Sequence, residues 1–122
     1  MDRKTVYAFM IAVLIAGCAP LVSKESKSEP VQEYYLASTG IAALNVWLPS
    51  SIVLDAGKQA RLIIENQANT SHGFSIDELG VREVIQPKEI KIITIKPEKA
   101  GIYRFYCHLH GSKHLGGSIM VR

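Results

Sequence analysis

The sequence predicts an all-β fold, and three observations lead to this prediction. From Tyr34 to the C-terminus, no stretch shows a sustained apolar period of 3.6 residues. Instead, short runs rich in β-branched or aromatic residues, some of them alternating in polarity, are separated by segments with turn-forming residues. Their spacing is typical of a β-sandwich. With 122 residues, of which 48% are hydrophobic, the chain has enough apolar material for one domain.

Four strands are expected in the first part of this region, each bounded by residues that favour turns. They are Ala43–Leu48, Ile52–Leu54, Ala60–Glu65 and Phe74–Ile76. The segments between them are Pro49-Ser50-Ser51, Asp55-Ala56-Gly57 and the polar run from Asn66 to Ser71.

Four further strands are expected after Phe74–Ile76. They are Glu83–Ile85, Lys91–Ile95, Gly101–Cys107 and Ser118–Val121, with Gln86-Pro87-Lys88 and Pro97 to Ala100 among the breakers. Since side chains alternate along a strand, Tyr103, Phe105 and Cys107 share one face, opposite Arg104. Cys107 is therefore expected to point into the core at the end of its strand.

The first 33 residues are expected to lie outside this domain. The charged residues Asp2 to Lys4 precede an apolar run of 11 residues, Val6 to Ala16, which is typical of a signal peptide and too short to span a membrane. Leu14 to Cys18 resembles a bacterial lipobox, which implies removal of residues 1–17 and acylation of Cys18. The alternative is an ordinary signal peptide with an incidental cysteine.

Residues 18–33, rich in Ser, Lys, Glu and Pro, are expected to form a flexible tether between the acylated Cys18 and a folded domain at residues 34–122. The protein is therefore predicted to be an exported bacterial lipoprotein. It would reside in a periplasm or at the outer face of the cytoplasmic membrane, attached to the membrane through its lipid.

The charge pattern argues against a nucleic-acid partner. The chain carries 14 Lys and Arg against 11 Asp and Glu, a net charge of +3, and the basic residues are interspersed with acidic ones.

The sequence contains no Gly-x-Gly-x-x-Gly, Walker or Gly-x-Ser-x-Gly pattern. These observations favour a function other than that of an enzyme.

A cluster of metal-binding residue types stands at the end of the strand that carries Cys107. Three of the four histidines, His108, His110 and His114, follow Cys107 within seven residues, and His72 precedes another expected strand. If Cys18 is acylated, Cys107 is the only thiol; a Cys18–Cys107 disulfide is the alternative. One thiolate with dispersed imidazoles favours copper over structural zinc, whose ligands usually come in pairs from two knuckles.

Several segments resemble the cupredoxin family and, within it, the red copper proteins called nitrosocyanins. The similar segments are Gly73 to Ile85, Lys99-Ala100-Gly101 and Cys107 to His110, within a resemblance that covers Ala43 to Val121. His72-Gly73-Phe74 also resembles the first copper-ligand segment of cytochrome oxidase subunit II domains. The resemblance implies a single Greek-key β-sandwich that binds one copper ion.

The resemblance also implies a ligand set for the copper. Carried over to this chain, the ligands are Cys107, His110 and His114, with His72 in place of the glutamate of nitrosocyanins. His114 lies one residue earlier than the second loop histidine of those proteins. His72, Cys107 and His110 alone would give the usual cupredoxin trio, and His114 could instead lie at the surface or behind the ligands.

The sequence offers no methionine at a place where it could serve as the axial copper ligand. After signal removal the only methionine is Met120, which lies in the last expected strand, too late to be an axial ligand. We therefore hypothesise a Cys-His₃ site with His114 as fourth ligand. Because imidazole binds more strongly than a thioether, such a site is expected to have a lower potential and a colour other than blue. His108 is expected to project away from the core and is left out of the ligand set.

The predicted function is one-electron transfer by a membrane-tethered mononuclear copper protein. The resemblance implies a redox partner protein such as a cytochrome or a membrane oxidase complex. Leu109, Gly111 and residues 115–117 are expected to form an apolar docking patch around the loop. The alternatives are a copper carrier or buffer for exported enzymes, and small-molecule chemistry with a nitrogen oxide at an open coordination position.

Overall fold

The computed structural model describes residues 17, 19–21, 23, 28–41 and 43–122. Residues 1–16 of the expected signal peptide, and Cys18, therefore lie outside the described residues. Within the described parts no helix is long and apolar enough to cross a membrane.

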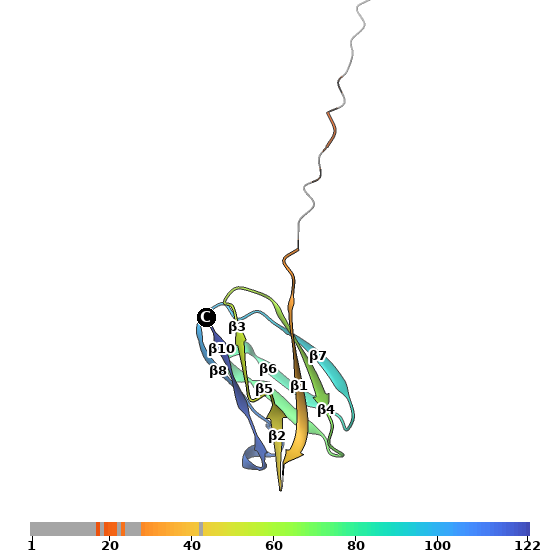
Figure 1. The fold of residues 1–122 in the computed structure, drawn as a ribbon, viewed down its shortest axis with the longest axis vertical. Coiled ribbons are helices and arrows are strands. Elements are labelled where there is room, and N and C mark those ends of the chain that lie inside the picture. Colours follow the sequence, from red (N-terminus) through yellow and green to blue (C-terminus); the bar gives the residue numbers. More distant parts are fainter. Residues whose placement is uncertain (1–16, 18, 22, 24–27, 42) are drawn as a thin grey trace, which may run out of the picture.

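The regular secondary structure of the described residues is almost entirely β, as predicted (Figure 1). The elements are β1 (Gln32–Ile41), β2 (Leu44–Leu48), β3 (Ser51–Leu54), β4 (Ala60–Asn66), β5 (His72–Ile76), η1 (Asp77–Leu79), β6 (Val81–Ile85), β7 (Ile90–Ile95), β8 (Gly101–Phe105), η2 (Gly111–Lys113), β9 (His114–Leu115) and β10 (Gly117–Val121).

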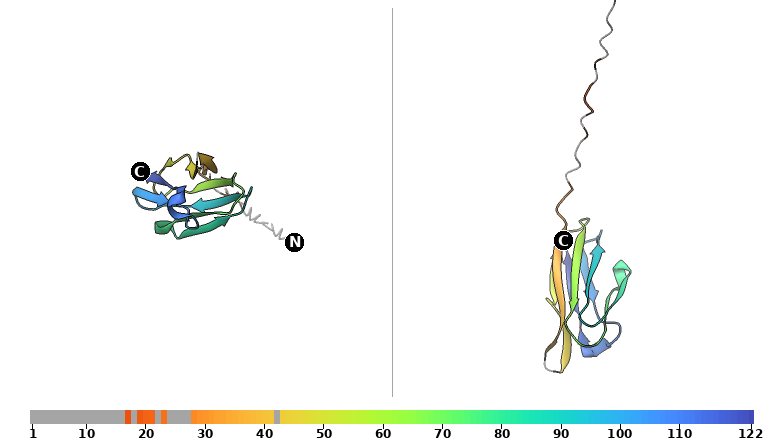
Figure 2. Two further views of the ribbon diagram at one scale, coloured as in Figure 1. Left: turned by 90° about the horizontal axis from the view of Figure 1, so that it is seen from below. Right: turned by 90° about the vertical axis from the view of Figure 1, so that its right-hand side faces the viewer.

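Two layers of strands form a Greek-key β-sandwich (Figure 2). The first layer is a five-stranded sheet in the order β7-β4-β1-β2-β9, and the second contains β3-β10-β8 and the pair β5-β6. Ser75 and Tyr106 join the parts of the second layer through two backbone hydrogen bonds of 2.9 and 3.1 Å. This link places β5 beside the chain that leaves β8.

The core lies between the layers because alternate side chains of each strand point inward. In β4, for example, Leu62 and Ile64 are buried while Arg61 and Ile63 are only partly covered. The largest buried side chains are those of Trp47, Phe74 and Phe105, from β2, β5 and β8. Three strands that are far apart in the sequence thus supply the centre of the core.

All eight expected strands are present, with ends that differ by at most two residues from the prediction. β1 and β9 were not predicted. In β1 the inward positions include Ser38, which is buried although polar, so the alternation of hydrophobicity is weak. β9 has only two residues and exists through its parallel pairing with β2. β1 begins at Gln32, two residues before the expected domain start.

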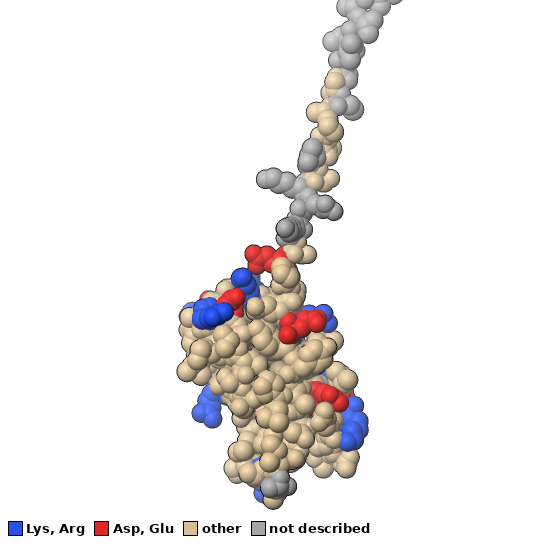
Figure 3. Space-filling view, viewed as in Figure 1, with Lys and Arg blue, Asp and Glu red and all other residues tan. Residues whose placement is uncertain are grey.

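The two ends of the sandwich differ in the chain segments that lie there and in their charge. The described chain before β1 leaves the domain at one end, and the loop from Cys107 to Gly117 lies at the other (Figure 1). On the face seen in Figure 3, most charged side chains lie toward the end of the chain entry, and the end with the loop is largely uncharged. The described residues that directly precede β1 therefore do not cover the loop end.

Candidate metal centre

Cys107 follows β8 and points into the sandwich. Phe105 and Cys107 are both buried, and Tyr103 packs against the core, so the alternation predicted for this strand is confirmed. Regular pairing ends at Phe105, and the bridge between Tyr106 and Ser75 holds the chain against β5 up to the cysteine. The thiol of Cys107 is free and buried.

His72 is the first residue of β5 and is completely buried. Its pairing with Ile85 of β6 fixes its backbone, and Asn66 supports the preceding turn through hydrogen bonds to the carbonyls of Thr70 and Ile85. The imidazole therefore enters the sandwich from a well-paired strand end.

His110 and His114 flank the short helix η2. His110 is partly exposed and His114 is buried. His114 begins β9, whose pairing with Asn45 of β2 attaches it to the five-stranded sheet. The two layers of the sandwich thus contribute separate residues to the same end of the core.

Two glycines close the loop over Phe105. A Cβ atom on Gly116 would overlap the carbonyl oxygen of Phe105, and one on Gly117 would overlap its ring and the carbonyl oxygen of Ser50. Only glycine fits such close approaches without moving the neighbouring backbone. The segment after His114 is therefore held tightly against β8.

The structure brings together all four residues that the sequence analysis proposed as ligands. One ligand atom each from His72, Cys107, His110 and His114 lies within 4.8 Å of all the others. The Nδ1 atom of His72 is 2.9 Å from that of His114 and 3.2 Å from that of His110. Cys107 Sγ lies 3.4 Å from His110 Nδ1 and 4.0 Å from His72 Nδ1.

This convergence fits a bound cation. Three ring nitrogens and one sulfur point toward one another inside the protein, where a cation is the one group that all four lone-pair donors can share. The set combines one thiolate sulfur with imidazole nitrogens, which are donors that copper prefers.

Burial keeps these imidazoles in the neutral form that a metal requires. It lowers the pKa of His114 from 6.5 to about 4, with the charges of protonated His72 and His110 acting in the same direction. Burial also lowers the pKa of His72, again with a contribution from His110. Near neutral pH both rings therefore offer lone pairs.

The sequence analysis missed two groups beside the cluster. Gly73 donates its backbone N–H to Cys107 Sγ at 3.2 Å. The ring of His108, which was expected to project away from the core, is half-buried and lies directly on Gly73. Gly73 directly follows His72 in the sequence, and His108 directly follows Cys107. This adjacency to a proposed ligand was the sequence signal that could have identified both groups.

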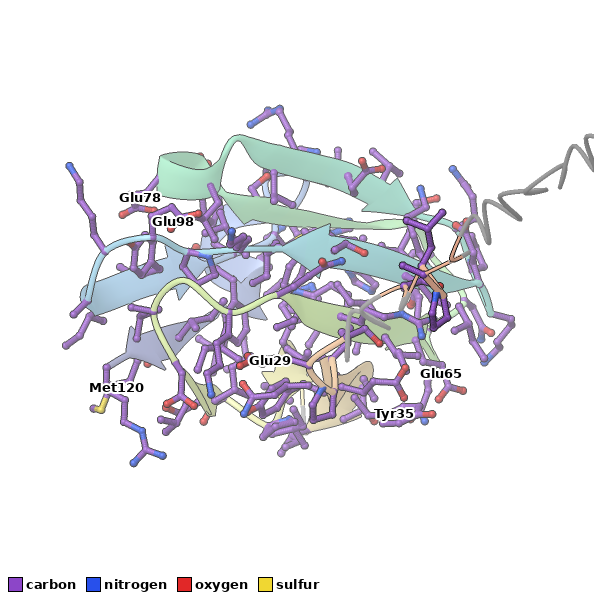
Figure 4. The ribbon with its side chains drawn as sticks, turned by 90° about the horizontal axis from the view of Figure 1, so that it is seen from above. Glu29, Tyr35, Glu65, Glu78, Glu98 and Met120 are labelled. Atoms are coloured by element: carbon purple, nitrogen blue, oxygen red, sulfur yellow. The ribbon has the colours of Figure 1, made fainter. Side chains whose placement is uncertain are left out.

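Met120 stands apart from the cluster, in agreement with its exclusion as an axial ligand. It lies in β10, is half exposed and pairs with Ile102 and Val53 of the neighbouring strands. Figure 4 shows its side chain pointing away from the sandwich.

A family comparison assigns this fold. The model of the cupredoxin-like domain matches residues 8–121, nearly the whole chain. The chain belongs to the cupredoxin-like domain family. No curated protein sequence matches the chain. The family and the buried Cys-His₃ cluster together support copper as the cofactor of this cupredoxin-like protein.

Solved structures show the same fold in parts of larger copper proteins. The multicopper oxidase McoA from Aquifex aeolicus matches with a TM-score of 0.66 and 12% identity, over 75% of this chain and 29% of that one. A multicopper oxidase from Pseudomonas thermotolerans matches with a TM-score of 0.63 and 17% sequence identity, over 78% of this chain and 30% of that one. The copper-containing nitrite reductase from Thermus scotoductus SA-01 matches with a TM-score of 0.61 and 18% sequence identity, over 76% of this chain and 28% of that one. This cupredoxin-like chain spans less than a third of each.

Proposed function

We propose that this protein is an exported, membrane-tethered electron-transfer protein, with one copper ion held by His72, Cys107, His110 and His114. The observation that carries the proposal is the convergence of these four donors from both layers of the sandwich. Copper bound there would supply a one-electron couple.

Rigid attachment of the donors supports electron transfer. His72 and His114 start paired strands, and Cys107 follows the bridge between Tyr106 and Ser75. Donors held by backbone pairing in a packed core change position little when the metal changes its charge, which favours rapid transfer of single electrons. Four donors around one point also leave less room for a substrate than three would.

The exposed edge of the site supports a protein partner. His110 is the only one of the four that is partly exposed. The neighbouring Leu109 and Leu115 are 47% and 48% exposed, and Leu44 of β2 is also exposed. Exposed apolar side chains around a redox site favour a transient contact with a partner surface such as that of a cytochrome or a membrane oxidase complex.

The position of the N-terminal segment supports the tether. The chain before β1 leaves the domain at the end opposite to the loop of Cys107 to Gly117 (Figure 1). With Cys18 acylated, a membrane at that end would leave the edge of His110 open to a partner.

The proposal includes the finer resemblance to nitrosocyanins. Since His114 lies among the other donors, a fourth strong ligand would weaken the copper–thiolate bond and produce a colour other than blue. Of the alternatives, a copper carrier predicts rapid release of the metal. Nitrogen oxide chemistry predicts an open coordination position on the copper.

The deciding experiment is a combined optical and EPR spectrum of the purified protein loaded with Cu(II), followed by cycles of reduction and oxidation. We expect an intense charge-transfer band, one copper per chain and reversible reduction without loss of metal. A colourless protein without bound copper would refute the proposal. Rapid copper transfer to a chelator would favour the carrier, and turnover of a nitrogen oxide would favour catalysis.

A further inference from the structure

His108, which is outside the cluster of four, is packed against the backbone of β5. A Cβ atom built on Gly73 would lie 2.5 Å from Nδ1, 2.7 Å from Cε1 and 2.9 Å from Cγ of His108. Real Cβ atoms do not approach other heavy atoms so closely, so the ring occupies the space that any side chain at position 73 would need.

Ser75 holds the ring of His108 in this place. Its buried hydroxyl lies 2.8 Å from His108 Nδ1, in a hydrogen bond whose direction depends on the tautomer of the ring. The backbone of Ser75 is in turn bonded both ways to Tyr106. The imidazole of His108 therefore cannot move away from Gly73 without breaking a hydrogen bond to a rigid partner.

Gly73, which lies under this ring, also forms a backbone hydrogen bond to the cysteine sulfur. Gly73 donates its N–H to Cys107 Sγ at 3.2 Å, in a buried position. A hydrogen bond to a metal-bound thiolate withdraws charge from the sulfur and so weakens its donation to the metal. The strength of this bond depends on how firmly the Gly73 amide is held toward Cys107.

We propose that His108 is a positioning residue: its ring, fixed by Ser75, clamps Gly73 so that the Gly73 N–H stays on Cys107 Sγ and tunes the copper–thiolate bond. This inference rests on the proposed function, because it requires copper on Cys107. His108 itself binds no metal in this arrangement.

The test compares His108→Ala with Ser75→Ala and with Ser112→Ala as the control. Ser112 is an exposed residue of the same loop, between His110 and His114. In His108→Ala we expect the charge-transfer band to shift to lower energy. We also expect the ratio of reduced to oxidised copper at a fixed applied potential to fall by up to about tenfold, or about 59 mV for one electron. Ser75→Ala should change both quantities in the same direction by less, and Ser112→Ala should change neither.

A second measurement uses the metal-free proteins. Hydrogen exchange of the Gly73 amide should be faster in His108→Ala and in Ser75→Ala than in the wild type, because the clamp protects this amide. Circular dichroism checks that each variant folds. If His108→Ala does not fold, Ser75→Ala alone provides the test.

The outcomes separate the inference from the proposed function. A wild-type protein without a charge-transfer band would overturn both. A wild-type band that persists unchanged in position and potential in His108→Ala and Ser75→Ala would overturn the positioning role alone. Unchanged exchange of the Gly73 amide in the folded variants would also overturn it.

Discussion

Trp47 stacks on the imidazole of His114, with ring centroids 4.9 Å apart and ring planes inclined by 23°. Both side chains are buried, and they come from β2 and β9, which pair in parallel. The indole also makes edge contacts with Phe74 and His72. A single core residue of the five-stranded sheet thus orients the residue proposed as the fourth ligand.

Replacement of Trp47 by alanine is expected to reduce stability and to disturb the metal site together. Loss of a buried aromatic side chain costs about 3–5 kcal/mol, because the cavity removes many packing contacts. Chemical denaturation of the metal-free protein measures this loss, and the copper spectrum should broaden as His114 gains freedom. Tyr35→Ala is the control, since Tyr35 is 70% exposed on the outer side of β1. A loss no greater than in Tyr35→Ala would contradict the prediction.

His114→Met is expected to move the site toward a blue copper centre. A thioether binds more weakly than imidazole, so the copper–thiolate bond should strengthen and the potential should rise. Optical spectra and potentiometry measure both changes. Lys113→Met places the same side chain one residue earlier at an exposed position and should leave both unchanged. If the spectrum and potential of His114→Met match the wild type, His114 is not a ligand.

The two cysteines are expected to have separate roles. Cys107→Ser should abolish the charge-transfer band, because that band requires a thiolate bound to copper. Cys18→Ser should preserve the band and release the protein from the membrane fraction, because the lipid attachment is lost. Spectra and membrane fractionation of both variants in cells check these results. A band that is absent from the wild type and appears only in Cys18→Ser would instead favour a Cys18–Cys107 disulfide, because a disulfide leaves no thiolate for copper.

The stability of the metal-free protein is expected to fall as the pH is lowered from 6.5 to about 4. The pKa of His114 is about 4 in the folded protein and 6.5 in the unfolded chain, so the unfolded state binds more protons in this window. Since one pKa unit corresponds to about 1.4 kcal/mol, the loss from this group is on the order of 3 kcal/mol. The lowered pKa of His72 adds to it.

Urea denaturation across this pH range measures the effect. His114→Gln keeps a polar side chain that does not titrate, and its stability should depend less on pH. A wild-type stability that is constant or rises toward pH 4 would contradict the prediction.

Local patterns in the sequence were enough to predict most of the fold. Period-two segments such as Ala60–Glu65, bounded by turn residues, predicted strands that the structure contains within two residues. The alternation along Gly101–Cys107 predicted that Cys107 points inward. These features are local because side-chain direction in a strand depends only on position along the chain. The clustering of Cys107, His110 and His114 likewise predicted a metal-binding loop, and the structure brings these three side chains together.

Contacts between distant segments were decided only by the tertiary structure. β1 and β9 depend on pairing with β4 and β2, and no local pattern marks a buried serine or a two-residue strand. The stacking of Trp47 on His114 and the packing of His108 on Gly73 join residues that are 67 and 35 positions apart. Such contacts arise when two layers pack into one core, and they depend on side-chain shapes that periodicity does not encode. The sequence thus determined which residues are available to hold a metal, and the packing of the layers determined which groups surround them.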